Sequence, residues 1–292
     1  MSVEKYLKHL RLDRLPHVWC PGCGHGIVLK AAVGAIEELG LNPDKIAVVS
    51  GIGCSSRATG YLNFNTMHTL HGRAIAFATG VKLARPDMHV IVMTGDGDAG
   101  AIGGNHFIHA ARRNMDITVI AFNNNIYGMT GGQYSPTTPE DCYATTSPYG
   151  NIEKPFDLSK IAIASGASYV ARATTFNFLD LQKYIKNGLS NAGYSFVEAV
   201  TQCPTYFGRY NKIGTAPKMM EYLKSAALPI SKAKKDMAAE LKCDEVSVSR
   251  VFELKESIYS DRIITGEFVN QPRPGYVDKY EKVIQKAGAH SE

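Results

Sequence analysis

The stretch HVIVMTGDGD, residues 89–98, begins as an apolar, β-branched run and ends in two aspartates separated by a glycine. Its first six residues are typical of a strand that is buried on both faces of a parallel sheet. Asp96 and Asp98 follow directly where such a strand would end. Because ligands of open α/β sheets bind outside the carboxyl ends of the strands, this acidic turn is a candidate binding site.

Three further apolar runs have the same form and lead into loops with reactive or metal-binding side chains. They are IAVVS at 46–50, ITVIAF at 117–122 and FVEAV at 196–200, followed by GIGCSSR, NNNIYG and TQCPTYFGR. Stretches with helical spacing lie between the runs, at 26–39, 71–84, 103–113 and 176–190. This alternation predicts an α/β fold, an open and mostly parallel sheet with helices on both faces.

Size and composition indicate an ordinary globular protein. Of the 292 residues, 45% are hydrophobic and 20% are charged. The charged N-terminal segment lacks an apolar signal core, and nothing approaches the run of about 18 apolar residues that spans a membrane, so we expect a cytoplasmic protein without a membrane partner. The net charge of +5 is too mild to indicate nucleic-acid binding.

The chain changes character along its length. Residues 125–156 are rich in Gly, Pro, Thr and Tyr, and a long irregular segment of this kind is either a functional loop or a sign that its elements are misassigned. After about residue 205, basic helical stretches and a tail punctuated by Pro and Gly replace the strand–helix pattern. We therefore predict a cofactor-binding domain at 1–204 and, at 205–292, a C-terminal extension that packs on the core or on a partner subunit.

Asp96 and Asn124 are candidate ligands of a hard divalent cation. A carboxylate and a carboxamide oxygen suit Mg²⁺, which leaves several coordination positions to the phosphates of a substrate or cofactor. Gly95 and Gly97 let the backbone approach such a ligand closely. The two residues follow successive predicted strands, so the pair is stronger evidence than the Gly-Asp-Gly turn alone.

Two cysteines three residues apart lie in WCPGCGHG, residues 19–26, and Cys54 and Cys203 each follow a predicted strand. In a long cytoplasmic chain, such thiols are more often metal ligands or redox groups than structural disulfides. A zinc site and an iron–sulfur site accept the same four thiolates, so their spacing does not separate the two. A Cys20–Cys23 redox disulfide would leave Cys54 and Cys203 unexplained. Two other cysteines have no strand-end context and are interpreted as structural: Cys142 and Cys243.

The sequence resembles a known family. Gly-Asp-Gly followed about 28 residues later by Asn-Asn is the pattern of thiamine-diphosphate enzymes. With CPGCGHG, GCSSR, LHGRA, GDGDAGAIGGNH, NNNIYGMTGGQ and TQCPTYFGR, the chain is similar, from about residue 17 to 210, to the β subunits of the 2-oxoacid:ferredoxin oxidoreductases. The resemblance implies thiamine diphosphate with Mg²⁺ on Asp96, Asn124 and the carbonyl of Ile126. It also implies one four-iron, four-sulfur cluster on Cys20, Cys23, Cys54 and Cys203.

Further site residues follow from the same resemblance. We expect His71 and Arg57 to act on the substrate or cofactor, Arg57 by binding a substrate carboxylate, a task that suits the planar guanidinium. His106 and His109 lie at helical spacing without a further ligand and are interpreted as structural. The expected cofactor contacts are His25, Gly95, Asp96, Gly97, Asp98, Asn124, Ile126, Tyr127 and Gly128.

The implied reaction is oxidative decarboxylation of a 2-oxoacid with coenzyme A, with electrons passing through the cluster to ferredoxin. Two positions favour 2-oxoglutarate over pyruvate or a broad substrate range. One is Arg57, and the other is Gly131, where some members of the family carry lysine. The chain offers no candidate for the activating glutamate of thiamine enzymes, so we expect an α subunit to supply it with most of the coenzyme A site. A non-redox thiamine enzyme with a structural zinc site and an electron-transfer module with a vestigial cofactor site are the alternatives.

Overall fold

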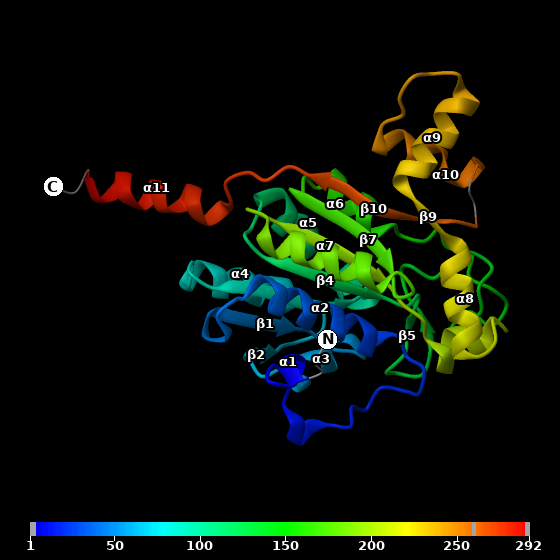
Figure 1. The fold of residues 1–292 in the computed structure, drawn as a ribbon, viewed down its shortest axis with the longest axis horizontal. Coiled ribbons are helices and arrows are strands. Elements are labelled where there is room, and N and C mark those ends of the chain that lie inside the picture. The colour runs from blue at the N-terminus through cyan, green and yellow to red at the C-terminus, as the bar shows by residue number, and fades with distance from the viewer. Residues whose placement is uncertain (1–3, 259–260, 290–292) are drawn as a thin grey trace.

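The computed structural model describes residues 4–258 and 261–289, which build a central eight-stranded sheet and a separate two-stranded hairpin (Figure 1). The order of strands in the sheet is β2-β1-β3-β4-β8-β7-β10-β9. In chain order the strands are β1 (Ile46–Ser50), β2 (Asn65–His68), β3 (His89–Gly95), β4 (Thr118–Asn123), β5 (Ile126–Tyr127), β6 (Gln133–Tyr134), β7 (Tyr169–Thr174), β8 (Ser195–Val200), β9 (Ala227–Pro229) and β10 (Ile263–Asn270).

The four strands predicted from the sequence are neighbours at the centre of this sheet. They lie in the order β1-β3-β4-β8 and run parallel throughout. Alternate residues of β3 face opposite cores: Val90 and Val92 belong to one apolar cluster, Ile91 and Met93 to the other. Burying each such side chain stabilises the fold by about 1.5–3 kcal/mol, which explains the unbroken apolar run. The predicted fold class is confirmed.

Helices cover both faces of the sheet, as predicted. One core lies under α2, α3 and α7, and the other lies under α4, α5, α6, α9 and α10. The four predicted helices, α2, α4, α5 and α7, begin within three residues of their expected starts. The helices are α1 (Glu4–Leu7), α2 (His25–Leu39), α3 (Ala58–Tyr61), α4 (Ala74–Ala84), α5 (Gly104–Arg113), α6 (Leu158–Ala164), α7 (Phe178–Ser190), α8 (Ala216–Ala226), α9 (Ile230–Leu241), α10 (Val248–Ile258) and α11 (Tyr276–Ala289).

The segment after residue 205 contributes to the same sheet. β10 pairs antiparallel with β7, and the short β9 pairs parallel with β10 (Figure 1). Helix α11 extends away from the body, with its first turn tied to the core by buried Val277. The division of the chain at residue 204 stays a prediction. No helix within the described ranges combines the length and apolar character that a membrane crossing needs.

Candidate functional site

A cavity of about 170 Å³ lies at the carboxyl ends of β1, β3 and β4, where the sequence predicts a site. All nine expected cofactor contacts and His71 line it. The strand-end loops therefore meet at one edge of the sheet, because the three strands are parallel neighbours. The full lining is His25, Ile52, Gly53, Cys54, Ser55, His71, Gly95, Asp96, Gly97, Asp98, Phe122, Asn124, Ile126, Tyr127, Gly128, Met129 and Thr130.

Asp96 lies at the end of β3 with its side chain buried. Two hydroxyls donate to one of its carboxylate oxygens: Ser135 Oγ at 2.6 Å and Thr137 Oγ1 at 2.7 Å from Oδ2. Burial raises the pKa of Asp96, while these hydroxyls and nearby backbone N–H groups oppose the rise. An anionic carboxylate here is costly without a positive partner, which is the condition that a cation would relieve.

Asn124 and Ile126 lie beyond the end of β4, in the turn that enters the β5–β6 hairpin. Asn125 adopts a left-handed conformation with φ of 60°, which asparagine tolerates well. The Asn124 Oδ1 atom accepts the Ile126 N–H at 3.3 Å, so the turn holds the amide oxygen in place. The donor set of a carboxylate, a carboxamide oxygen and a nearby backbone carbonyl has the hard oxygens that Mg²⁺ prefers.

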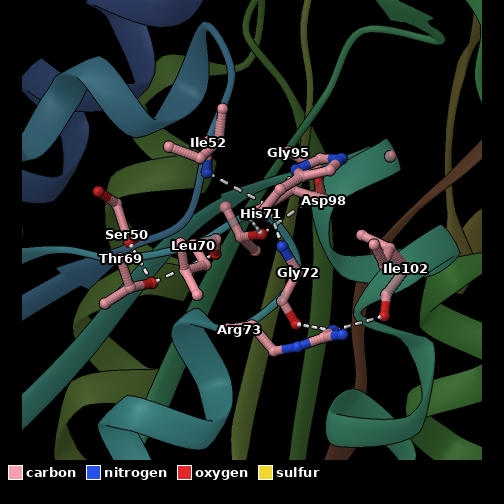
Figure 2. Close-up of polar contacts among 12 residues, drawn as sticks. Ser50, Ile52, Thr69, Leu70, His71, Gly72, Arg73, Gly95, Asp98 and Ile102 are labelled. Atoms are coloured by element: carbon pink, nitrogen blue, oxygen red, sulfur yellow. Dashed lines mark hydrogen bonds and ion pairs between the residues drawn. The ribbon is translucent and has the colours of Figure 1, made fainter.

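Asp98 anchors His71 at the wall of the cavity (Figure 2). Its Oδ1 atom contacts His71 Nδ1 at 2.7 Å and accepts the Gly72 N–H at 2.7 Å, while Thr94 donates to Oδ2 at 2.7 Å. The Asp98 side chain is almost fully buried, whereas that of His71 is 36% exposed. Asp98 thus fixes the ring of His71 from behind and leaves its other edge for a ligand.

Tyr127 packs its ring over Gly97 and donates its hydroxyl to the Gly97 carbonyl at 3.2 Å. Burial, with the neighbouring Asp96 and Asp98 carboxylates, raises the pKa of Tyr127 to about 12. The phenol is therefore a neutral hydrogen-bond donor at neutral pH. A Cβ atom at position 97 would lie 2.2 Å from the Tyr127 ring, so only glycine fits there without a shift.

Gly97→Ala tests this close approach. The added methyl must displace the Tyr127 ring, and such overpacking costs about 1–3 kcal/mol. We expect the binding constant for thiamine diphosphate, measured by titration calorimetry with Mg²⁺, to weaken about tenfold or more. Gly80→Ala is the matched control, because a Cβ at that position in helix α4 meets nothing within 4 Å. Unchanged binding in Gly97→Ala would show that the ring has room to move.

His25, the first residue of α2, is buried beside the cavity. Its ring packs against Trp19 and Phe122, with centroids 5.8 and 5.2 Å away. Its Nδ1 atom is buried and has no hydrogen-bond partner among the described residues. Burial lowers the pKa of His25 to about 4, so the ring is neutral at neutral pH. A neutral ring with an unsatisfied nitrogen is ready to bind a ligand group.

Hydrogen bonds bring the segments that carry the distant cysteines together. The Trp19 indole N–H donates to the Cys54 carbonyl at 2.7 Å. On the other side, Gln202 Nε2 donates to the Gly22 carbonyl, and the Gly24 N–H donates to the Gln202 carbonyl, both at 3.2 Å. The loop of Cys20 and Cys23 is thereby tied to the ends of β1 and β8, beside Cys54 and Cys203.

The four thiols influence one another electrostatically. Burial, and after it the sulfurs of the other three cysteines, raises the pKa of Cys23 to about 12, against a lowering hydrogen bond from the His25 backbone. Burial, then Cys203, Cys20 and Asp96, raises the pKa of Cys54 to about 11. A Cβ at Gly128 would lie 3.3 Å from Cys54 Sγ and 4.0 Å from Cys203 Sγ, so both sulfurs lie on this glycine.

Cys203 also receives several backbone hydrogen bonds. The N–H groups of Thr205, Tyr206 and Phe207 bond its sulfur and oppose the rise in pKa that burial causes. Such N–H groups favour a thiolate.

All six cysteines are free thiols. Within residues 4–258 and 261–289, no group of three or more His, Cys, Asp or Glu side chains is arranged to hold a single metal ion.

The remaining predicted residues lie outside the cavity. Arg57 is exposed in the short turn after Cys54 and does not line the cavity, so its role toward substrate stays a prediction. His106 and His109 lie on α5, where His109 accepts a hydrogen bond from Arg112. Cys142 is half-buried in the long loop, and Cys243 is exposed.

Sequence reasoning missed six residues of the cavity lining, namely Ile52, Gly53, Ser55, Phe122, Met129 and Thr130. It also missed the two hydroxyl residues that bond Asp96, Ser135 and Thr137. Both come from the irregular loop at 125–156, which folds back so that their hydroxyls reach Asp96. The run Ser-Pro-Thr-Thr at 135–138 was the available signal, since clustered hydroxyls around a proline indicate an ordered turn. Nothing in the sequence specifies that the turn contacts a residue 39 positions earlier.

Comparisons with known proteins identify relatives of this chain. Residues 51–199 match the family model described as thiamine pyrophosphate enzyme, C-terminal TPP binding domain. The chain is 51% identical to a 2-oxoglutarate synthase subunit KorB of Methanocaldococcus jannaschii, over 96% of this chain and 97% of that protein. It is 52% identical to the KorB subunit of Methanothermobacter marburgensis, over 99% of this chain and 96% of that protein. A solved 2-oxoglutarate:ferredoxin oxidoreductase from Magnetococcus marinus, with 2-oxoglutarate, coenzyme A and succinyl-CoA bound, superposes with a TM-score of 0.83 at 36% identity, covering 99% of this chain and 92% of that chain.

Proposed function

Because the chain belongs to the 2-oxoglutarate synthase KorB subunits, within the thiamine pyrophosphate enzymes, we propose that it is the β subunit of a 2-oxoglutarate:ferredoxin oxidoreductase. The reaction converts 2-oxoglutarate and coenzyme A into succinyl-CoA and CO₂, and two electrons leave to ferredoxin. The observation that carries the proposal is the position of Cys54, which lines the cofactor cavity and also lies within the group of four thiols.

The cavity suits thiamine diphosphate with Mg²⁺. When bound, the cofactor supplies the electron sink that decarboxylation of a 2-oxoacid requires. Asp96, Asn124 and the carbonyl of Ile126 would hold the cation, which in turn holds the diphosphate. Burial of Asp96 makes its carboxylate a strong partner for a cation, and the glycines at 95 and 97 leave room beside it.

The four thiols suit one four-iron, four-sulfur cluster. Such a cluster requires four thiolate ligands. When bound, it would transfer electrons one at a time, which suits a route from an organic cofactor to ferredoxin. Four irons accept thiolates that lie farther apart than the ligands of one ion. The backbone N–H groups at Cys203 and Cys23 would stabilise the bound thiolates.

The other cavity residues bind and orient. His71, held by Asp98, lines the cavity next to Tyr127, with the two ring centroids 6.1 Å apart. The Tyr127 hydroxyl is neutral and donates to the Gly97 carbonyl. The neutral ring of His25 has an unsatisfied Nδ1 atom beside the cavity, while the backbone N–H of His25 bonds the Cys23 sulfur. His25 therefore contacts both the cavity and the group of four thiols. Phe122 and Ile126 contribute apolar side chains to the lining of the cavity.

Partners complete the enzyme in this proposal. An α subunit supplies the activating glutamate and most of the coenzyme A site, and a ferredoxin receives the electrons. Six free thiols suit a reducing compartment, and we propose the cytoplasm as the location.

The experiment that tests the proposal compares 2-oxoglutarate and pyruvate in the complex with the α subunit. We expect ferredoxin reduction with 2-oxoglutarate at a kcat/KM at least about tenfold higher than with pyruvate, because a second carboxylate adds about 1.5–3 kcal/mol of charged hydrogen bonding. Arg57→Ala should raise the KM for 2-oxoglutarate and leave that for pyruvate unchanged. A preference that survives Arg57→Ala removes Arg57 from substrate recognition, and equal rates with both acids contradict the substrate assignment.

A further inference from the structure

A buried ion cluster lies behind the candidate metal site, on the neighbouring strands β7 and β8. Arg172 and Glu198 are register partners, with Arg172 Nε 2.8 Å from Glu198 Oε2. Asp157, which caps the start of α6, pairs with the other side of the Arg172 guanidinium. Arg172 is 5% exposed and Glu198 is 2% exposed. The cluster therefore lies on the face of the sheet covered by α6, where Asp157, Arg172 and Glu198 border a second, wide cavity.

Sheet stability alone does not account for this cluster. Removing two charges from water costs more than their attraction returns unless every polar atom is satisfied, and apolar residues of similar volume are often at least as stabilising. The neighbours of Arg172 and Glu198 on the same strands are apolar or small, as in the rest of the core. A role in positioning other groups is the better explanation.

A chain of hydrogen bonds leads from Glu198 to Asp96. Glu198 Oε1 accepts from Asn123 Nδ2 at 2.8 Å. Asn123 Oδ1 lies 3.0 Å from the Thr137 hydroxyl, which donates to Asp96 Oδ2 at 2.7 Å. Thr137 and Asn123 are both buried, and both border the same wide cavity as Arg172 and Glu198.

The charge on Glu198 fixes the direction of this chain. A carboxylate only accepts hydrogen bonds, so the Asn123 amide must turn its NH₂ group to Glu198 and its carbonyl to Thr137. Glu198 itself is held by Arg172 and by the Ser159 hydroxyl, which donates to Oε2 at 2.6 Å. The Thr137 hydroxyl therefore faces two acceptors, Asn123 Oδ1 and Asp96 Oδ2, and shares its single proton between them, so that both contacts together set the position of the hydroxyl.

We propose that Glu198, Asn123 and Thr137 form a positioning relay, anchored on Arg172, that holds the Asp96 carboxylate in the orientation that binds Mg²⁺. The relay acts on Oδ2 of Asp96, the oxygen that accepts from Thr137 and Ser135. This inference rests on the proposed cofactor site. In this proposal each relay residue acts through its neighbour on Asp96.

The test measures cofactor retention rather than activity. In the complex with the α subunit, equilibrium dialysis gives the Mg²⁺ concentration at which half of the sites hold thiamine diphosphate. Thr137→Val removes the hydroxyl and keeps the volume; alanine would leave room for water, because Thr137 also lines a second cavity of about 1730 Å³. Asn123→Ala breaks the relay without touching Asp96, and Ser159→Ala loosens Glu198 one step farther back.

We expect the half-saturating Mg²⁺ concentration to rise about tenfold in Thr137→Val and Asn123→Ala and about threefold in Ser159→Ala, with recovery in Thr137→Ser. Thr118→Val is the matched control: its buried hydroxyl, at the opposite end of β4, donates to the Gly188 carbonyl, and its Mg²⁺ requirement should be that of the wild type.

A wild-type Mg²⁺ requirement in Asn123→Ala overturns the relay, since Thr137 would then act alone. If circular dichroism shows that Asn123→Ala does not fold, a wild-type Mg²⁺ requirement in Ser159→Ala overturns the relay instead. A lower unfolding temperature with an unchanged Mg²⁺ requirement also overturns it, because that is the result of a purely structural network. Failure of the wild-type complex to retain thiamine diphosphate would instead refute the proposed function.

Discussion

Replacing Asp96 with asparagine should abolish activity and leave the fold intact. The amide has the shape of the carboxylate, and the Ser135 and Thr137 hydroxyls can donate to it or accept from it. The charge that attracts the cation is lost, so we expect cofactor affinity to fall more than about 100-fold, beyond the loss typical of an outer-shell change. Ferredoxin reduction at fixed cofactor should fall about 10³-fold.

The stability of the cofactor-free Asp96→Asn variant should not fall with its activity. Burial raises the pKa of Asp96, so the empty protein carries a carboxylate that its surroundings disfavour. The neutral amide of the Asp96→Asn variant removes that cost, and we expect the free energy of unfolding of the cofactor-free chain to stay equal or rise by about 1 kcal/mol. Functional groups held at a cost to stability are common in active sites.

Asp116→Asn separates the two effects. Burial also raises the pKa of Asp116, but this residue lies at the amino end of β4, where its carboxylate accepts the Gly193 N–H. The control should keep full activity and thiamine diphosphate binding by calorimetry. Retention of more than about a tenth of wild-type activity in Asp96→Asn would contradict the assignment of Asp96 as a metal ligand.

Local pattern was sufficient to predict the centre of the fold. β1, β3, β4 and β8 are each buried on both faces, and such strands leave an apolar run that is visible in the sequence. β7 was missed because Arg172 interrupts its apolar run, and β10 because it alternates buried and half-buried residues within a tail rich in Gly and Pro. The arginine that hid the strand is the anchor of the proposed relay.

The site was predictable only as far as strand ends determine it. Asp96, Asn124, Cys54 and Cys203 follow strands, so parallel pairing alone brings them to one edge. The contacts of Ser135 and Thr137 depend instead on how an irregular loop of roughly 30 residues folds, a length at which local pattern gives no guide. The bond between His71 and Asp98 likewise joins two loops whose separate sequences do not indicate each other.

Replacing Cys203 with alanine should remove electron transfer and spare the cofactor. We expect the purified wild-type complex to be brown, with a broad iron–sulfide absorption band at about 400 nm. The variant should lose that absorption band. Ferredoxin reduction should fall at least about 100-fold, while thiamine diphosphate is retained at the wild-type Mg²⁺ concentration. The difference arises because Cys203 is absent from the lining of the cofactor cavity.

Cys142→Ala is the control for this result. Burial raises the pKa of Cys142 too, but its sulfur lies in the long loop outside the four-thiol group, so the variant should keep both colour and activity. A colourless wild-type protein with one zinc per chain would eliminate the cluster and with it the electron route. Loss of thiamine diphosphate together with the band in Cys203→Ala would mean that the four thiols support the cavity through Cys54 and Gly128, against which both sulfurs pack, rather than serving a separate redox centre.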